Sequence, residues 1–288
     1  MKYEFIFLHR SRFRLQKMCK ALHIYRSGYY SWLKRGSSQR ELDNEKLLKE
    51  IKQVHEQSRQ IYGSPRITAE LKSKNIICSK NRVARVMRKN KIRSKIKRKH
   101  KVTTTNSKHR FYVAANLLDQ NFHAERPNQI WLSDITYLKV LNKWMYLVVI
   151  LDLFSRQVIS WALSHDLSSD FVLAAIKKAV RRRNPEKGLI FHSDRGVQYA
   201  SNDVAQYLEE HGIIQSMSRK GDCYDNAVSE SFFNTFKSEF YVFENFVSVN
   251  DAYLKIFDYI DIFYNHKRIH SSLKYMSPVN FEKQFYQQ

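Results

Sequence analysis

The sequence contains little cysteine and no long uninterrupted hydrophobic run. Only 3 of its 288 residues are cysteines. They lie far apart, at Cys19, Cys78 and Cys223, and no Cys-x-x-Cys pair occurs. An odd and dispersed set of this kind excludes a disulfide framework and a zinc site, and it fits a reducing compartment. The longest apolar run, from Trp144 to Phe154, is too short to cross a bilayer and contains an aspartate.

Targeting signals and internal repeats are also missing. Residues 5–8 form only a short apolar run, and no small-residue cleavage pattern follows it, so we expect no signal peptide. No lipidation motif and no repeat of fixed period is present. We therefore expect a cytoplasmic protein with no membrane partner.

Acidic residues are scarce in the first third of the chain, which is strongly basic. Residues 1–110 contain 31 Lys and Arg but only 7 Asp and Glu, whereas residues 111–288 contain 19 and 20, and the net charge is +23. A basic segment of this size predicts a polyanionic partner, and double-stranded DNA is the leading candidate. An acidic membrane surface is the rival, but no amphipathic anchor accompanies the charge.

The first forty residues indicate two short helices. Between residues 12 and 35, apolar side chains recur at helical spacing, and Ser27-Gly28 is interpreted as the break between the helices. The pattern fits a small helix-turn-helix or a helical hairpin that only packs against its neighbour. Residues 36–39 are interpreted as a linker.

Residues 41–94 predict a helix-turn-helix domain. Amphipathic helices are expected over 42–57 and 66–74, and Pro65 suits the first turn of the second. Ser79 is expected to cap a third helix with a basic exposed side, which is the arrangement of a recognition helix. The candidate DNA contacts on that helix are Arg82, Arg85, Arg88 and Lys89.

A polybasic stretch, residues 92–110, follows without a periodic apolar face. We interpret it as a linker that follows the DNA backbone and orders on binding. Its candidate phosphate contacts are Lys95, Lys97, Arg98 and Lys99.

The rest of the chain predicts an α/β core. Strands are expected over 130–140, 144–152 and 158–163, followed by a helix that Ser168 caps. Further strands and helices then alternate, which by pattern alone indicates a mixed sheet flanked by helices. The four aromatic residues Phe232, Phe233, Phe236 and Phe240 recur at helical spacing and are interpreted as core packing. Residues 252–264 are expected to form another amphipathic helix.

Three carboxylates on separate predicted elements are the candidate catalytic site. Asp134 lies inside the apolar run WLSDITYL, and Asp194 follows the apolar run that ends in FHS. Glu230 is expected in the second turn of a helix that begins near Asn226, which we interpret as a cap. Three acids of this kind are what a two-metal site for phosphoryl transfer requires, with Mg²⁺ or Mn²⁺ as the ions.

These residues carry a resemblance to a known family. The spacing of Asp134, Asp194 and Glu230 matches the DDE pattern of retroviral-type integrases and bacterial transposases. The words HSDRGVQY, DNAVSESFFNTFKSE and YNHKRIHSSLKYMSP resemble the second-reading-frame transposases of the insertion sequence three family. The resemblance implies a ribonuclease-H-like integrase core preceded by a helix-turn-helix region. It also implies metal-dependent cleavage at the element ends, followed by strand transfer from a 3′-OH.

The resemblance further implies partners and a division of the chain. The partners are the terminal inverted repeats, target DNA, further copies of the chain in a homo-oligomer, and an upstream-frame product or frameshift fusion. We expect an N-terminal helical segment, a helix-turn-helix domain, a basic linker and a catalytic core with a C-terminal helical extension. Their expected bounds are residues 1–40, 41–94, 95–123 and 124–285.

Several other residues keep two interpretations. His192 could tune the metal site or merely pack, and Asn226 is an accessory candidate that capping also explains. Lys237 lies two helical turns after Glu230. A base at that offset contacts the DNA end in retroviral-type integrases, and a solvated lysine is the alternative. For Arg268 and His270 we favour pinning of the C-terminal turn over DNA contact. Asp152 is expected only to cap a turn.

The same residues also allow two other functions. A non-enzymatic DNA-binding regulator would use the basic region and treat the rest as a sensor or dimerisation domain, but it has no need of the three acids. A metal-dependent nuclease would use the acids without strand transfer. A paired-carboxylate glycosidase explains neither the third acid nor the basic region.

Overall fold

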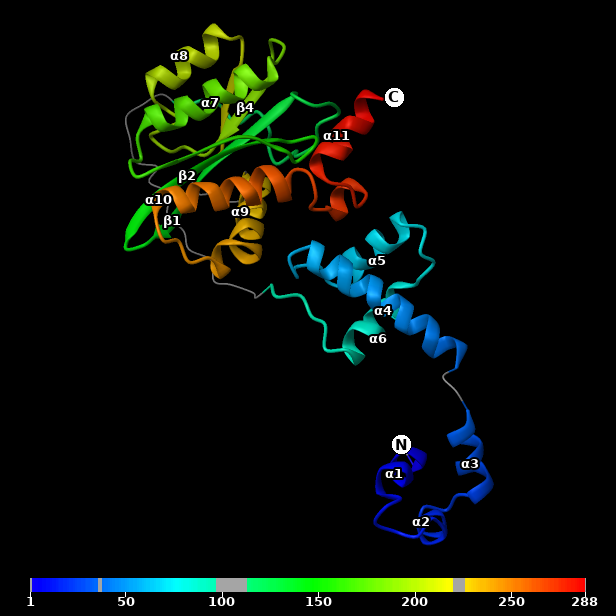
Figure 1. Ribbon diagram of the computed structural model, residues 1–288. Coiled ribbons are helices and arrows are strands. Elements are labelled where there is room, and N and C mark those ends of the chain that lie inside the picture. Colours follow the sequence, from blue (N-terminus) through cyan, green and yellow to red (C-terminus); the bar gives the residue numbers. More distant parts are fainter. Residues whose placement is uncertain (1, 36–37, 97–112, 220–225, 288) are drawn as a thin grey trace.

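The computed structural model describes residues 2–35, 38–96, 113–219 and 226–287. Figure 1 shows two small helical units and an α/β core arranged along the chain. The first unit contains three short helices with their own small core, in which Met18, Cys19 and Tyr29 pack together with Ile6. The helices are α1 (Lys2–His9), α2 (Leu15–Ala21) and α3 (Arg26–Lys34).

The break expected at Ser27-Gly28 is wrong, because both residues lie inside α3. The turn between α2 and α3 is instead at residues 22–25, where His23 adopts a left-handed backbone with φ 51°. Gly28 is needed for packing rather than for a turn. A Cβ built there would lie 2.6 Å from the Tyr3 hydroxyl, so α1 approaches α3 closely at this point.

The second unit is the helix-turn-helix region, built from α4 (Gln39–Gln57), α5 (Ser64–Ser73) and α6 (Lys80–Lys89). Ser38 and Glu41 form a capping box at the start of α4. Pro65 lies in the first turn of α5, and the Ser79 hydroxyl accepts from the backbone N–H of Arg82 at 3.2 Å. The expected signals at the starts of α5 and α6 are thus confirmed.

The core is a mixed five-stranded sheet in the order β3-β2-β1-β4-β5. The first three strands form an antiparallel meander, because only a short turn around Leu141 joins the first pair. The last two strands run parallel to β1 and are reached through helices. The strands are β1 (Ile130–Val140), β2 (Lys143–Asp152), β3 (Val158–Ser164), β4 (Ile190–Ser193) and β5 (Ile214–Met217).

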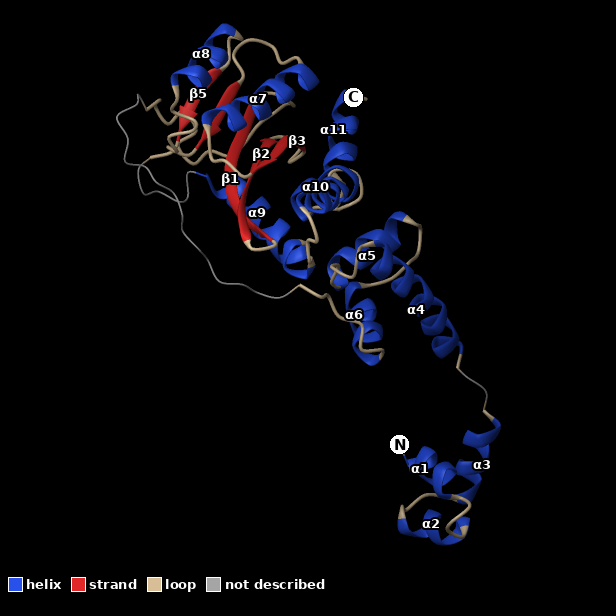
Figure 2. Ribbon diagram, turned by 60° about the vertical axis from the view of Figure 1, so that its left-hand side comes forward, coloured by secondary structure: helices blue, strands red, loops and turns tan. Residues whose placement is uncertain are grey.

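Both faces of the sheet are covered, because neighbouring strand residues point to opposite sides. Trp131 packs in one cluster with α7 (Ser169–Arg183) and α8 (Asn202–Glu210). Leu132, the next residue, belongs to the other cluster, which holds the four phenylalanines of the region around α9 (Ala227–Glu239). Figure 2 shows α7 and α9 on different sides of the strands. The predicted α/β class and the core role of the phenylalanine stripe are confirmed.

The helix expected over residues 252–264 differs in its start and in its second half. It begins as α10 (Val249–Phe257) and continues as the π-helix η3 (Asp258–Tyr264). The wider π turn buries Tyr259, Ile260 and Phe263 of the amphipathic face.

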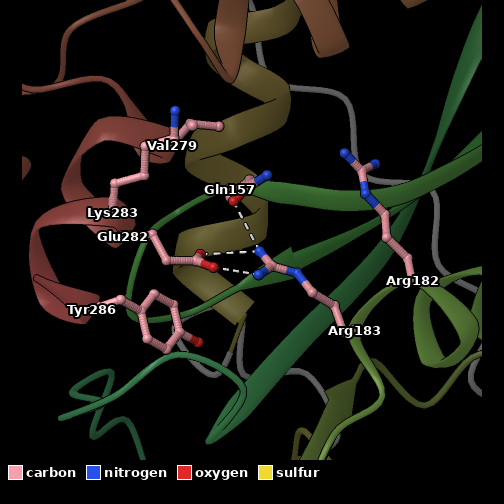
Figure 3. A pocket seen from close by; sticks show the side chains of 7 residues that line it. All are labelled: Gln157, Arg182, Arg183, Val279, Glu282, Lys283 and Tyr286. Atoms are coloured by element: carbon pink, nitrogen blue, oxygen red, sulfur yellow. Dashed lines mark hydrogen bonds and ion pairs between the residues drawn. The ribbon is translucent and has the colours of Figure 1, made fainter.

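The last helix, α11 (Pro278–Tyr286), is fastened to the core by an ion pair. Arg183, at the end of α7, pairs with Glu282 and donates to the Gln157 side-chain oxygen at 2.8 Å. Figure 3 shows these side chains converging at a shallow pocket between α7 and α11. Within the described parts of the chain, we find no helix long and apolar enough to cross a membrane.

Candidate active site

Asp134 lies in the middle of β1, between β2 and β4, with its side chain half-buried. One carboxylate oxygen accepts from the backbone N–H of Ile135 at 2.8 Å. Burial raises the pKa of Asp134 well above its usual range, the charges of Asp194 and Glu230 raise it further, and the Ile135 bond opposes them. The carboxyl thus lies where negative charge is unfavourable without a cation.

Asp194 follows directly after β4 and is level with Asp134. The parallel register pairs Leu132 with His192, so each aspartate comes two residues after a paired position on neighbouring strands. The Asp194 carboxylate accepts from the Gly196 N–H at 2.9 Å. A Cβ on Gly196 would lie 3.0 Å from that same oxygen, so a side chain at this position would press on the Asp194 carboxylate.

Glu230 approaches the two aspartates from α9, which packs against β1. It lies in the first turn of the helix rather than the expected second, because α9 begins at Ala227. Lys237 is also half-buried, and burial lowers its pKa while the charge of Asp134 opposes that shift. The lysine therefore lies within the field of the carboxylates and is not a fully solvated side chain.

The three carboxylates repel one another electrostatically, but they do not lie close enough together to bind a metal ion as they stand. Over the described residues, no group of three or more His, Cys, Asp and Glu side chains is arranged to hold a metal ion. Their donor chemistry nevertheless suits a divalent cation, since magnesium takes carboxylate oxygens and usually binds through one or two of them. Burial is the main cause of the raised pKa of Asp134, and the charges of Asp194 and Glu230 add to it; a cation bound between the carboxylates would relieve that repulsion.

Tyr199 is a neighbour that the sequence did not identify. Its hydroxyl lies 2.8 Å from the Ser133 hydroxyl, beside Asp134 on β1. Burial raises its pKa well above the usual range, and the charges of Asp194 and Asp134 add to the shift. Its place in the word HSDRGVQY was the only available signal.

His192 and Asn226, the two accessory candidates, have different surroundings. His192 is fully buried, and its Nδ1 lies 2.9 Å from the Ser216 hydroxyl on β5. Asn226 occupies the N-cap position of α9, but its side chain makes no capping hydrogen bond, so that interpretation is wrong. Its Oδ1 is instead buried and has no hydrogen-bond partner among the described residues, and the same holds for the Ser229 hydroxyl one turn later.

Asp152 has the structural role that was expected. Its carboxylate accepts from the backbone N–H groups of Ser155 at 2.9 Å and Asn128 at 2.6 Å. These bonds close the turn after β2 and hold the chain that enters β1.

Comparison with known proteins places these geometric features in a family. The integrase core domain model matches residues 124–223, a second integrase core domain model matches residues 230–285, and the HTH-like domain model matches residues 41–100. Transposase InsF of insertion sequence IS3A from Escherichia coli strain K12 is 38% identical over 284 residues, covering 98% of both chains. The chain belongs to the InsF family of insertion-sequence transposases.

One further sequence relative and one solved structure are also similar to this chain. The uncharacterized 31 kDa protein of insertion element IS600 from Shigella sonnei is 40% identical over 270 residues, covering 94% of this chain and 99% of that protein. Among solved structures, the HTLV-2 integrase catalytic core domain in complex with magnesium aligns with a TM-score of 0.44 and 18% identity. That alignment covers 56% of this chain and 99% of the other.

The helix-turn-helix region of this family member presents only part of the expected basic surface. Arg85, Arg88 and Lys89 are exposed on α6. Arg82 is half-buried, and its Nε donates to the Asn44 side chain on α4 at 2.9 Å. The structure thus distinguishes three exposed cations from one that joins two helices.

Only the first of the linker candidates lies within the described residues. The Lys95 ammonium is 4.7 Å from the centre of the Phe243 ring, and burial lowers its pKa. Its backbone N–H donates to the Gln60 carbonyl at 2.9 Å. Lys95 is therefore held against the core, whereas Lys97, Arg98 and Lys99 lie outside the described residues.

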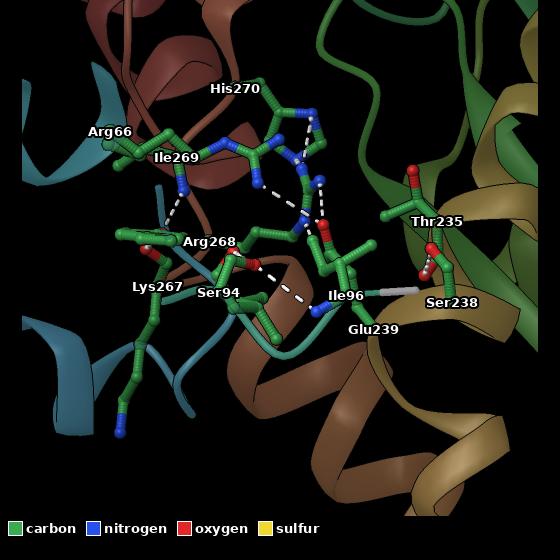
Figure 4. A network of polar contacts seen from close by, with 12 residues as sticks. Arg66, Ser94, Ile96, Thr235, Ser238, Glu239, Lys267, Arg268, Ile269 and His270 are labelled. Carbon is green, nitrogen blue, oxygen red and sulfur yellow. Dashed lines mark hydrogen bonds and ion pairs between the residues drawn. The ribbon is translucent and has the colours of Figure 1, made fainter. Parts of the chain in front are cut away.

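Arg268 and His270 belong to a polar network between α5, α9 and the closing loop, residues 265–277 (Figure 4). Arg268 is 3% exposed and makes two bonds to Glu239, at 2.6 and 2.7 Å. Arg66, from α5, reaches the same carboxylate at 3.3 Å. His270 accepts from Arg268 at 3.0 Å. The geometry therefore favours the pinning role over DNA contact.

Proposed function

We propose that this chain is a DDE polynucleotidyl transferase that cleaves DNA at the ends of its insertion sequence and joins the resulting 3′-OH to target DNA. The observation that carries the proposal is the level placement of Asp134 and Asp194 on adjacent parallel strands, with the Glu230 helix packed against β1. Family membership supports it, because the integrase core matches include all three acids.

The proposed cofactor is a pair of Mg²⁺ or Mn²⁺ ions held by the same three carboxylates. When bound, such ions lower the pKa of an attacking oxygen and stabilise the charge on the leaving one. Asp134 and Asp194 would hold the ions from the sheet, and Glu230 would complete the site from α9. The repulsion among the three acids supports this assignment, since a cation between them relieves it.

Lys237 is proposed to hold a DNA phosphate next to the reacting bond. Its helical offset of seven residues from Glu230 places both side chains on one face of α9. Its partial burial beside Asp134 supports the role, because a cation with little water around it binds a phosphate more strongly. His192, through its contact with Ser216, would position the strand before Asp194, and the buried side-chain oxygen of Asn226 would adjust the start of α9.

The proposed DNA-binding surfaces lie mainly before the core. Exposed Arg85, Arg88 and Lys89 of α6 would contact the terminal inverted repeats, with Arg82 supporting the helix from behind. The basic linker would neutralise phosphates through Lys95, Lys97, Arg98 and Lys99. The proposed domains are a helical segment at 1–40, the helix-turn-helix at 41–94, the linker at 95–123 and the catalytic core with its extension at 124–285.

The proposed partners and location follow from this chemistry. Two element ends must be joined in one complex, which supports a homo-oligomer assembled on DNA. An upstream-frame product, or a frameshift fusion with it, would add a further DNA-binding module. The substrate is bacterial DNA, so we propose that the protein acts in the cytoplasm at the nucleoid.

A joining assay run beside a binding assay tests the proposal. The substrate is a labelled duplex taken from an end of the element that encodes the chain, with a supercoiled plasmid as target. We expect Asp134→Asn, Asp194→Asn and Glu230→Gln each to abolish cleavage and joining in Mg²⁺ or Mn²⁺ while DNA binding persists.

Asp166→Asn, at an exposed acid before α7, is the matched control and should join normally. Near wild-type joining by any of the three variants would contradict the assignment of that residue. Cleavage without joining by the wild-type protein would instead favour a nuclease.

A further inference from the structure

The α1–α3 unit has the organisation of a second helix-turn-helix, although the family models begin only at residue 41. Helix α3 follows α2 after a four-residue turn, and α1 packs behind α3. Tyr3 of α1 contacts the rings of Tyr29 and Trp32 at centroid distances of 6.5 and 5.9 Å. These contacts bury one side of α3 and hold it within the unit.

The opposite side of α3 carries side chains suited to reading DNA. Residues at spacings of one, three, one and three along the helix form one continuous exposed stripe, because such spacings return to the same face. The stripe consists of Arg26, Ser27, Tyr30, Ser31 and Lys34. Guanidinium, hydroxyl and ammonium groups are the donors that contact base edges and phosphates in the major groove.

Charge identifies the partner of this stripe. Residues 2–35 contain nine Lys and Arg and a single acidic residue, Glu4. Lys17 and Lys20 of α2 are exposed next to the turn, where the first helix of a helix-turn-helix crosses the phosphate backbone. The unit has its own core and shares no core cluster with α4–α6. Its surface is thus complementary to a duplex and independent of the α6 surface.

We propose that α1–α3 is a second sequence-reading DNA-binding unit, with α3 as the helix that enters the major groove. The chain would then contact an element end at two separate places, one through α3 and one through α6. This inference concerns end recognition alone, so it stands or falls independently of the carboxylate chemistry.

The test uses the full chain and a duplex of about 40 base pairs taken from an element end, with a scrambled duplex of equal length. The triple variant Arg26→Ala, Tyr30→Ala, Lys34→Ala should weaken end binding roughly tenfold or more, and scrambled binding much less. The control variant Lys177→Ala, Arg181→Ala removes two exposed charges from α7 and should change neither affinity.

Footprinting and a conservative variant complete the test. The wild type should protect two patches of the element end, and the α3 triple variant should lose one of them. An Arg85→Ala, Arg88→Ala variant should lose the other. Arg26→Lys keeps the charge but not the planar fork, so it should weaken end binding while scrambled binding is unchanged.

Affinities and footprint equal to those of the α7 control would overturn the proposal. Equal losses on both duplexes would also overturn it, because they would show contact with phosphates only. If the Arg85→Ala, Arg88→Ala variant still protects both patches, the α6 assignment is contradicted. The loss of a patch in the α3 triple variant then decides the α3 proposal by itself.

Discussion

Glu239 and Arg268 form a buried two-point ion pair that joins the end of α9 to the closing loop. The arginine Nε donates to Oε2 at 2.6 Å, and its Nη2 donates to Oε1 at 2.7 Å. Glu239 comes nine residues after Glu230, which on a helix is the opposite face. The same helix therefore directs one carboxylate toward the candidate site and another toward α5, where Arg66 also contacts it.

Removal of the Glu239 charge should strongly destabilise the protein. In Glu239→Gln, the guanidinium of Arg268 stays buried without its counter-charge, and we expect the free energy of unfolding to fall by about 3–5 kcal/mol. Urea unfolding followed by circular dichroism measures this. Glu244→Gln, which breaks a half-exposed pair with Lys255, is the control and should cost less than about 1 kcal/mol. A similar small loss in both variants would show that the buried pair is not required.

Acid should destabilise the closing loop through His270. Burial, together with the charges of Arg268, Arg66 and Arg156, lowers the pKa of His270 to about 2. The unfolded chain binds a proton near pH 6.5 that the folded protein does not bind. The stability contribution is therefore complete above that pH and is lost progressively below it, by about 2 kcal/mol between pH 7 and pH 5.

His270→Gln should remove this part of the pH dependence, because glutamine can still accept from Arg268 but does not titrate. Denaturant unfolding at several pH values, compared with the wild type, measures the difference. Parallel pH profiles for the two proteins would contradict the assignment.

Asp134→Asn should make the metal-free protein more stable at neutral pH. The pKa of Asp134 is raised, so its charge opposes folding as the pH rises through that value, and an amide removes the unfavourable charge. Each kcal/mol gained corresponds to about 2–4 °C in Tm for a domain of this size.

Magnesium should reverse the order. Added Mg²⁺ should raise the Tm of the wild type and raise that of Asp134→Asn much less, since binding to the folded state stabilises it. An equal rise in Tm of both proteins on addition of Mg²⁺, measured by calorimetry, would contradict the proposed metal role of Asp134.

Gly196→Ala should impair catalysis more than folding. The new Cβ would lie 3.0 Å from the Asp194 carboxylate and 3.1 Å from the Gln198 side-chain oxygen, so the carboxylate must shift. A displacement of this kind can reduce a rate by about a hundredfold. We expect joining to fall while Tm changes little. Gly63→Ala, whose nearest neighbour is an ordinary 3.7 Å contact with Pro65, is the control.

Substitutions at Arg85 and Arg82 should have different effects: the first on DNA affinity and the second on folding stability. Arg85→Ala should weaken binding to the element end by about 1–3 kcal/mol if its fork contacts a guanine. Arg82→Ala should instead lower the free energy of unfolding by about 1 kcal/mol, because it loses the bond to Asn44. Fluorescence anisotropy and urea unfolding on both variants provide the comparison. The reverse pattern would exchange the two roles.

Local sequence patterns were enough to predict the order of the core elements and to select the three candidate acids. Strand alternation, the caps at Ser79 and Ser168 and the phenylalanine stripe are local patterns, and local patterns follow from backbone geometry and side-chain spacing. The resemblance carried by HSDRGVQY and the two longer motifs added the expected ribonuclease-H-like fold and the expected catalytic roles of the three acids.

Which polar groups meet became known only from the folded chain. Tyr199 reaches Ser133 across 66 residues, and Arg82 bonds to α4 instead of remaining exposed. Gly28, which by local pattern marks a break, instead lies inside α3 where α1 packs closely against it. Such pairings depend on which distant segments are brought together when apolar faces are buried, and no local spacing specifies a partner that lies far away in the chain.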